Sequence, residues 1–241
     1  MDVSYADPVV AAFVVIPVLL VVALLWGTIT AWRRSGATPQ AASQAGLAVG
    51  AAALVWMIGT WSAAESGVLR RWDQDPPPFA LLVAAILVVS LLIAFSRLGR
   101  YLARYVPLWA LVAVQGFRLP LELAMHAMYE RGIMPGVMSY SGRNFDIVTG
   151  ATAIAVAILV RLGIGSSRLV AVWNVLGLAL LVNVVTVAIL ATPRFAYFGR
   201  ESLNTWVMYP PFVWLPAVMV LAALTGHLLI FRALRFPLEP R

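Results

Sequence analysis

The chain alternates along its whole length between long apolar stretches and short polar segments. Seven stretches are apolar over about the 20 residues that a helix needs to cross a hydrocarbon core of about 30 Å. They cover residues 9–32, 45–65, 79–97, 107–128, 145–161, 169–191 and 210–232. The pattern predicts an all-α, polytopic membrane protein with seven transmembrane helices in a single domain, residues 1–241.

Composition agrees with this fold class. Hydrophobic residues make up 62% of the chain and charged residues 11%, against about 45–50% and about 25% in soluble domains. The first ten residues contain Asp2 and Asp7 and no basic residue. A signal peptide begins with a basic segment, so we expect residues 9–32 to be a true first span.

The arginines predict the orientation. With seven spans and an outer N-terminus, the inner side receives Arg33, Arg34, Arg97, Arg100, Arg104, Arg161, Arg168, Arg232, Arg235 and Arg241. The outer side receives Arg70, Arg71, Arg131, Arg143, Arg194 and Arg200. Basic residues in short loops favour the cytoplasmic side. We therefore expect the N-terminus outside and the C-terminus inside.

Two missing residue types exclude several kinds of chemistry. All 17 basic residues are arginine, so no lysine can form the Schiff base of a retinal protein. There is no cysteine either, which excludes disulfides, thiolate metal sites and cysteine nucleophiles. Arginines at helix ends suit the head groups of anionic membrane lipids, and we expect no nucleic-acid partner. No P-loop is present, and the cofactor is unknown.

One predicted span carries a polar stripe. At 100° per residue, five side chains fall within an arc of about 80° on one helix face: Gln115, Arg118, Glu122, His126 and Tyr129. Pro120 removes one backbone hydrogen bond and predicts a kink near Gly116. The stripe fits the lining of a ligand site. Alternatively, Arg118 and Glu122, spaced i,i+4, neutralise each other and serve only helix packing.

Polar groups from other spans reach a similar predicted depth. At 1.5 Å per residue, Arg118 lies roughly 21 Å above Arg104, and Asn183 lies roughly 22 Å above Arg168. The candidate ligand-binding residues in this outer half are Arg118, Glu122, His126, Asn144, Asp146, Asn183 and Trp214. Each of the last four also has a structural interpretation. Asn144 and Asp146 suit an N-cap, Asn183 suits an interhelical hydrogen bond, and Trp214 suits an interfacial aromatic belt.

Two histidines and two serines are candidates for metal or nucleophile chemistry. His126 is predicted near the outer surface and His227 near the inner one, so the two should not share a metal ion. Ser139 and Ser141 lack an evident partner base, which weakens the case for a serine nucleophile. Asn174 lies 180° around its helix from Asn183, and we interpret it as structural.

Several short sequence motifs in the second half of the chain resemble those of one protein family. They are FRLPLE (117–122), GRNFD (142–146), WN (173–174), PFVWLP (211–216) and GH (226–227). They are similar to motifs found in an uncharacterised family of bacterial seven-span membrane proteins to which no activity is assigned. The resemblance covers about residues 105–232 and implies the seven-helix architecture and the choice of site residues, without implying a function.

Taken together, the sequence predicts a multi-pass protein of the bacterial inner membrane. The leading hypothesis is that it binds or translocates a small, anionic or amphipathic ligand, with Arg118 as counter-charge. The ligand would occupy a pocket open to the outer side, enclosed by the last four spans below the loop 129–143. The alternatives are an intramembrane enzyme acting on lipid or isoprenoid substrates and an assembly subunit of a membrane complex.

Overall fold

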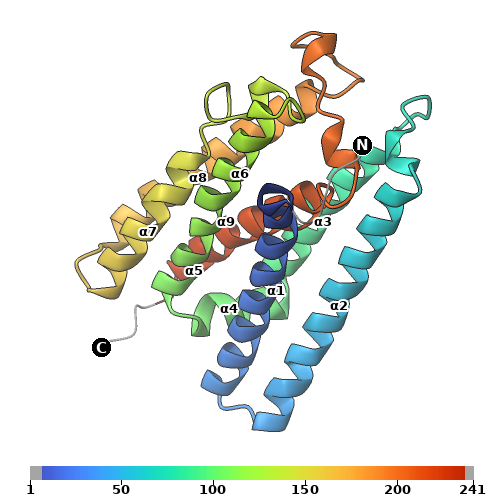
Figure 1. The fold of residues 1–241 in the computed structure, drawn as a ribbon. Coiled ribbons are helices and arrows are strands. Elements are labelled where there is room, and N and C mark those ends of the chain that lie inside the picture. Colours follow the sequence, from blue (N-terminus) through green and yellow to red (C-terminus); the bar gives the residue numbers. More distant parts are fainter. Residues whose placement is uncertain (1–6, 237–241) are drawn as a thin grey trace.

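The computed structural model describes residues 7–236, and every regular element in this range is helical. The α-helices are α1 (Pro8–Arg34), α2 (Pro39–Glu65), α3 (Pro78–Phe95), α4 (Arg97–Tyr105), α5 (Leu108–Val114), α6 (Arg118–Glu130), α7 (Ile147–Arg161), α8 (Ser167–Leu190) and α9 (Leu221–Ala233) (Figure 1). Short 3-10 turns are η1 (Val68–Arg70), η2 (Gln115–Phe117), η3 (Gly136–Met138), η4 (Arg200–Ser202) and η5 (Trp206–Met208). A π-helical segment, η6 (Leu215–Val220), leads directly into α9.

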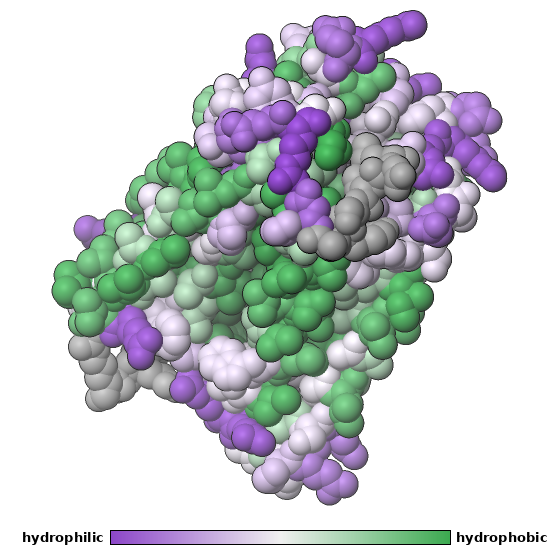
Figure 2. Space-filling model, viewed as in Figure 1, coloured by the Kyte–Doolittle hydropathy of each residue, from purple (hydrophilic) through white to green (hydrophobic). Residues whose placement is uncertain are grey.

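Within residues 7–236, six helical segments are long and apolar enough to cross a membrane. They are Pro8–Arg34, Pro39–Glu65, Pro78–Phe95, Leu108–Glu130, Ser167–Leu190 and Leu215–Ala233. Figure 2 shows the matching surface, a broad hydrophobic zone with hydrophilic residues gathered at its two ends. The predicted all-helical fold is therefore confirmed, and the six apolar segments support a multi-pass membrane protein.

The remaining predicted span does not meet that length. Helix α7 has 15 residues, about 22 Å of helix, against a hydrocarbon core of about 30 Å. The prediction of seven full-length membrane helices is therefore not established by the structure. The reason is local: residues 139–146 precede α7 as turns and irregular backbone rather than as helix.

Side chains at one end of the bundle join helices that are far apart in sequence. Arg34 at the end of α1 donates to the carbonyl oxygen of Tyr105 at 3.1 Å. The Arg161 guanidinium at the end of α7 lies 4.8 Å from the centre of the Trp109 ring, near the start of α5. This end therefore gathers the ends of α1, α4 and α7 together with the beginning of α5 (Figure 1).

The opposite end gathers the remaining connections. Arg131, just after α6, forms an ion pair with Asp7, which caps the first turn of α1. The hydrogen bond from Arg131 holds the pKa of the Asp7 carboxyl below its ordinary value. Arg194 and Asp75 approach to 3.8 Å and link two further loops. Successive long helices thus run alternately between the two ends, and α7 follows the same alternation (Figure 1).

Helix α4 was not predicted, and it changes the depth of the site. Its arginines and tyrosines make it strongly amphipathic, and the Tyr101 ring contacts that of Trp32 in a tilted arrangement, with 4.5 Å between ring centres. Such a helix lies along the membrane interface. The depth of Arg118 is therefore measured from Leu108, where its span begins, and not from Arg104, which was the reference in the sequence-based estimate. This places Arg118 about 15 Å along the span, nearer the middle of the bundle than the sequence indicated.

Three glycines allow the helices around the site to approach closely. A Cβ atom on Gly150 of α7 would lie 2.3 Å from the backbone nitrogen of Leu119 in α6. A Cβ on Gly177 of α8 would lie 2.7 Å from Cε1 of His227, and one on Gly226 would lie 2.1 Å from the Gln115 side chain. Small residues at such contacts are typical of membrane helix packing. They bring α6, α7, α8 and α9 together at one level.

Candidate functional site

Arg118 is the first residue of α6, directly after a break in the helix. The α-helical hydrogen bonding of α5 ends at Val114, and the 3-10 turn η2 covers Gln115–Phe117. Pro120 has no N–H to donate to the carbonyl of Gly116, and a tighter 3-10 turn accommodates that loss. The α-helical hydrogen bonding is thus interrupted at the position of the predicted kink near Gly116, directly before Arg118.

The Arg118 guanidinium is buried and has two partners from other helices. Only 1% of Arg118 is exposed. Its Nε lies 3.1 Å from Oδ2 of Asp146, immediately before α7, and its Nη1 lies 3.0 Å from Nε2 of His227 on α9. The carboxylate that neutralises Arg118 is therefore Asp146, and the predicted i,i+4 pair with Glu122 is replaced by this interhelical pair.

Asp146 stands at the N-cap position of α7, but its side chain makes no capping hydrogen bond. Its Oδ2 faces Arg118 and its Oδ1 accepts a hydrogen bond from Thr149 Oγ1 at 3.2 Å. Its backbone N–H donates to Oδ1 of Asn144 at 3.0 Å. The N-cap interpretation of the Asp146 side chain therefore does not apply, and the carboxylate is committed to the ionic cluster.

Glu122 lies one helical turn beyond Arg118 on α6 and is 2% exposed. Its Oε2 accepts a hydrogen bond from Nδ2 of Asn144 at 2.7 Å. The same amide donates to the carbonyl oxygen of Met138 at 3.0 Å. Asn144 thus holds the irregular segment before α7 against α6 and brings Glu122 and Asp146 into one cluster.

His227 and Asn174 belong to this cluster, contrary to their predicted places. Because arginine can only donate, Nε2 of His227 accepts from Arg118 and its Nδ1 carries the hydrogen. That Nδ1–H donates to Oδ1 of Asn174 at 2.8 Å, and Nδ2 of Asn174 donates to the His227 carbonyl oxygen at 3.0 Å. His227 is fully buried rather than near the inner surface. If the depth of Arg118 had been measured from Leu108, the sequence would have placed His227 within side-chain reach of Arg118.

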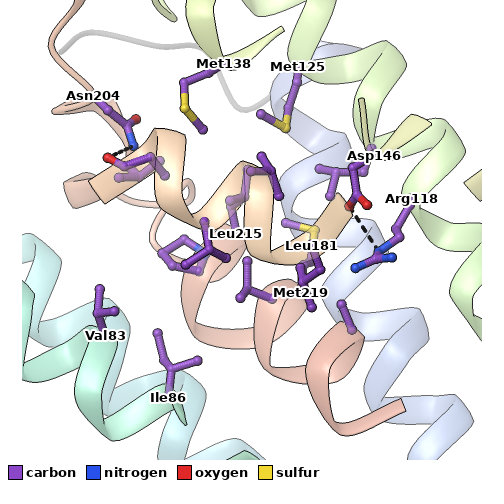
Figure 3. Close-up of a pocket in the computed structure, with 18 of the residues that line it drawn as sticks. Val83, Ile86, Arg118, Met125, Met138, Asp146, Leu181, Asn204, Leu215 and Met219 are labelled. Carbon is purple, nitrogen blue, oxygen red and sulfur yellow. Dashed lines mark hydrogen bonds and ion pairs between the residues drawn. The ribbon is translucent and has the colours of Figure 1, made fainter. Parts of the chain in front are cut away.

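A cavity of about 80 Å³ lies beside the cluster (Figure 3). Its polar lining residues are Arg118, Glu122, Asp146 and Asn204, and all others are apolar. The apolar walls come from α3, α6, α8 and η6, with Val83 and Ile86 of α3 opposite the Arg118–Asp146 pair in Figure 3. The enclosure therefore differs from the predicted one, because α3 forms a wall and α7 contributes only its preceding Asp146.

Three side-chain atoms of lining residues have no hydrogen-bond partner among the described residues: Nε of Arg118, which faces Asp146 as an ion pair, Nη2 of Arg118, and Oδ1 of Asn204. Among residues 7–236, nothing accepts a hydrogen bond from Nη2 of Arg118, although that atom is buried. A buried donor without an acceptor costs about 1–3 kcal/mol, and more when the group is charged. An acceptor atom supplied by a molecule in the cavity would remove that cost.

His126 shares the helix face of Arg118 but does not line the cavity. Its Nδ1 lies 2.7 Å from the hydroxyl of Ser139, its ring stacks on Tyr140 at 4.3 Å, and its Nε2 lies 3.6 Å from Glu130. Ser139 thus has a neighbouring base that the sequence did not reveal. However, Ser139 is fully buried and its oxygen also accepts from Ser141. These contacts hold the loop above the cavity in place.

Asn183 and Trp214 also make contacts away from the cavity. Nδ2 of Asn183 donates to the carbonyl oxygen of Arg143 at 2.8 Å. Nε1 of Trp214 donates to the carbonyl oxygen of Met57 at 3.1 Å, and its ring lies 5.0 Å from that of Trp61. Of the seven sequence-predicted residues, the structure brings together Arg118, Glu122, Asn144 and Asp146.

No protein-family model, curated protein or solved structure matches this chain. The resemblance to bacterial seven-span proteins therefore stays a prediction. Within the described residues, no three histidine, aspartate or glutamate side chains come together in a group that could hold a metal ion. The chemistry of the site is that of a buried cation, two carboxyl groups and a neutral histidine beside an apolar cavity.

Proposed function

We propose that the protein binds a small amphipathic molecule within the membrane, in the cavity beside Arg118. One observation carries this proposal: a buried guanidinium with an unpaired Nη2 lies in the wall of an otherwise mainly apolar cavity. Ligand pockets typically combine an apolar lining with a few polar groups that fix orientation. The apolar part of the ligand would contact α3, α8 and η6, and its polar group would accept a hydrogen bond from Arg118.

The charges around the cavity favour a neutral polar group over an anionic one. Asp146 already neutralises Arg118 at 3.1 Å, and Glu122 adds a second carboxyl group to the same lining. The His227 ring is neutral, because its Nε2 accepts a hydrogen bond from Arg118 while its Nδ1–H donates to Asn174. An anionic ligand would add negative charge where no positive charge is left uncompensated. The proposal therefore keeps the amphipathic ligand of the sequence hypothesis and drops the anionic one.

This proposal includes seven membrane crossings, with the N-terminus outside and the C-terminus in the cytoplasm of a bacterial cell. The support for a seventh crossing is that the irregular segment before α7 is buried in protein at Ser139, Asn144 and Asp146. Non-helical backbone is tolerated at membrane depth when protein surrounds it. That segment and the 15 residues of α7 would together complete the crossing.

Reporter fusions test the topology. Fusions after Arg34, Arg100 and Ser166 should report the cytoplasm, and fusions near Asp75 and Pro135 should report the outside. The physical reason is the larger number of arginines in the loops that would face the cytoplasm. A cytoplasmic signal from the Pro135 fusion would contradict the proposed orientation.

Ligand binding is tested with the protein in lipid nanodiscs and 1-decanol as the probe. The matched variant is Arg118→Lys, which keeps the positive charge beside Asp146 and removes the second terminal nitrogen of the guanidinium. A hydrogen bond to a charged group contributes about 1.5–3 kcal/mol. We therefore expect 1-decanol to raise the melting temperature of the wild-type protein and to bind the variant at least about tenfold more weakly. Equal stabilisation of both proteins would contradict the proposal.

A further inference from the structure

The exposed part of the cavity wall is entirely apolar. Among the lining residues, those that keep some solvent-accessible surface on α3 and α8 are Val83, Leu87, Val185, Ala188 and Ile189. Phe117 and Val220 complete this set. Leu87 is the most exposed of them, at 43%. The cavity therefore communicates with the outside of the protein between α3 and α8.

This opening lies at the depth of the hydrocarbon core. Leu87 is near the middle of α3, which spans Pro78–Phe95 and is therefore about 27 Å long. Helix α3 contains no charged residue between its ends, and both α3 and α8 pack against α9. A molecule that enters between α3 and α8 would therefore come from the acyl-chain region of the bilayer rather than from water.

The end of the cavity beneath the loops is closed. Met138, Asn204 and Val207 line the cavity at that end, and each is 2% exposed. The amide of Asn204 reaches the carbonyl oxygen of Ala188 at 3.4 Å (Figure 3). A ligand entering at that end would therefore have to displace these buried side chains.

The size of the cavity limits what it can enclose. At about 80 Å³, it has roughly half the volume of a 150 Å³ cavity that binds benzene. It can enclose a small head group and the first few carbon atoms of a chain, but not the head group of a phospholipid. The rest of the chain would pass between Leu87 and Val185 and stay in the bilayer.

The hydrogen-bonding groups select the head group. Arg118 Nη2 needs an acceptor, while the carboxyl groups of Glu122 and Asp146 line the same cavity and can accept a hydrogen bond. A hydroxyl group provides both an acceptor and a donor without adding charge. A carboxylate or phosphate head group would face two carboxyl groups at short range.

Resting on the proposed function, we infer that the ligand is a single-chain lipid alcohol that enters head first from the bilayer, between α3 and α8. The hydroxyl oxygen accepts from Arg118, and the hydroxyl hydrogen is donated to Glu122 or Asp146. The chain, linear or isoprenoid, occupies the opening in the bound state. Bulky side chains at the opening should therefore weaken binding without touching the ionic cluster.

The test uses a 1-dodecanol carrying a photoreactive diazirine close to its hydroxyl group, in nanodiscs, with covalent labelling measured by mass spectrometry. The double variant Leu87→Trp/Val185→Trp narrows the opening. Its matched control is Leu92→Trp/Val182→Trp, on the same two helices at residues that are 64% and 57% exposed and do not line the cavity. We expect labelling to fall at least about tenfold in the first variant and to change less than about twofold in the control.

The outcomes separate the two proposals. If the narrowed variant is labelled like the wild type while Arg118→Lys loses labelling, entry between α3 and α8 is wrong and the binding function stands. If dodecanoate competes as well as dodecanol does, the hydroxyl assignment is wrong. If neither the wild type nor any variant is labelled at the cavity, the proposed function fails together with this inference.

Discussion

Replacing Arg118 by methionine should lower the free energy of unfolding by about 3–5 kcal/mol, because it leaves a carboxylate in the interior without its partner. That carboxylate belongs to Asp146, which lies 3.1 Å from the guanidinium and is 4% exposed. The double variant Arg118→Met/Asp146→Asn removes both charges and should recover much of the loss. The measurement is chemical unfolding of the wild-type, single and double variants in one detergent.

A second cycle distinguishes the partner of Arg118. In Arg118→Met/Glu122→Gln the Asp146 carboxylate is still unpaired, so this double variant should recover far less stability than the pair with Asp146. Equal recovery in the two cycles, or simple additivity in both, would contradict the arrangement of the ionic cluster. The comparison is informative because Glu122 is bonded to Asn144 at 2.7 Å and not to Arg118.

Replacing Gly150 by alanine should also destabilise the protein, relative to a Gly→Ala replacement at an uncrowded position. The new Cβ would lie 2.3 Å from the backbone nitrogen of Leu119 and 2.8 Å from the carbonyl carbon of Arg118. Overpacking a well-packed interior typically costs about 1–3 kcal/mol, and here no side-chain rotation can relieve the contact because both neighbours are backbone atoms. Helix α7 would have to move away from α6, which would also separate Asp146 from Arg118.

The matched control is Gly59→Ala on α2, where no other group of the described residues would lie within 4 Å of the new Cβ. Alanine is favoured over glycine inside a helix by about 1 kcal/mol, and that gain applies equally at both positions. The free energies of unfolding of the two variants, measured in the same detergent, should therefore differ only by the cost of the contact at Gly150. Equal stabilities would show that α6 and α7 are not packed as described.

The sequence was sufficient to predict the membrane class of the protein and much of the membership of the ionic cluster. Hydrophobic stretches located the apolar helices to within a few residues, except at the start of α2 and before η6, because lipid contact imposes a continuous apolar surface. Pro120 predicted the break before Arg118, because a missing N–H has a fixed position in the hydrogen-bonding pattern. Charged residues inside an apolar span identified Arg118 and Glu122, because such residues face the protein interior.

The partners within the cluster could not be predicted in the same way. Which helix faces Arg118 depends on close approaches at Gly150 and Gly177, and hydropathy carries no information on helix rotation. His227 was misplaced because the depth of Arg118 was measured from Arg104, which belongs to the separate amphipathic helix α4, and this overstated the depth of Arg118. His126 lies on the predicted face, but at its height the neighbour is Ser139 of the loop and not the cavity.

The central claim is that the unpaired nitrogen of Arg118 holds the polar group of a membrane-derived ligand. A crystal structure of the protein, from crystals grown in a lipid phase that contains 1-dodecanol, tests this claim most directly. The hydroxyl oxygen should lie within about 3 Å of Nη2, and the chain should leave between Leu87 and Val185. A cavity filled by the protein's own side chains, with Nη2 bonded to one of them and no dodecanol present, would contradict the claim.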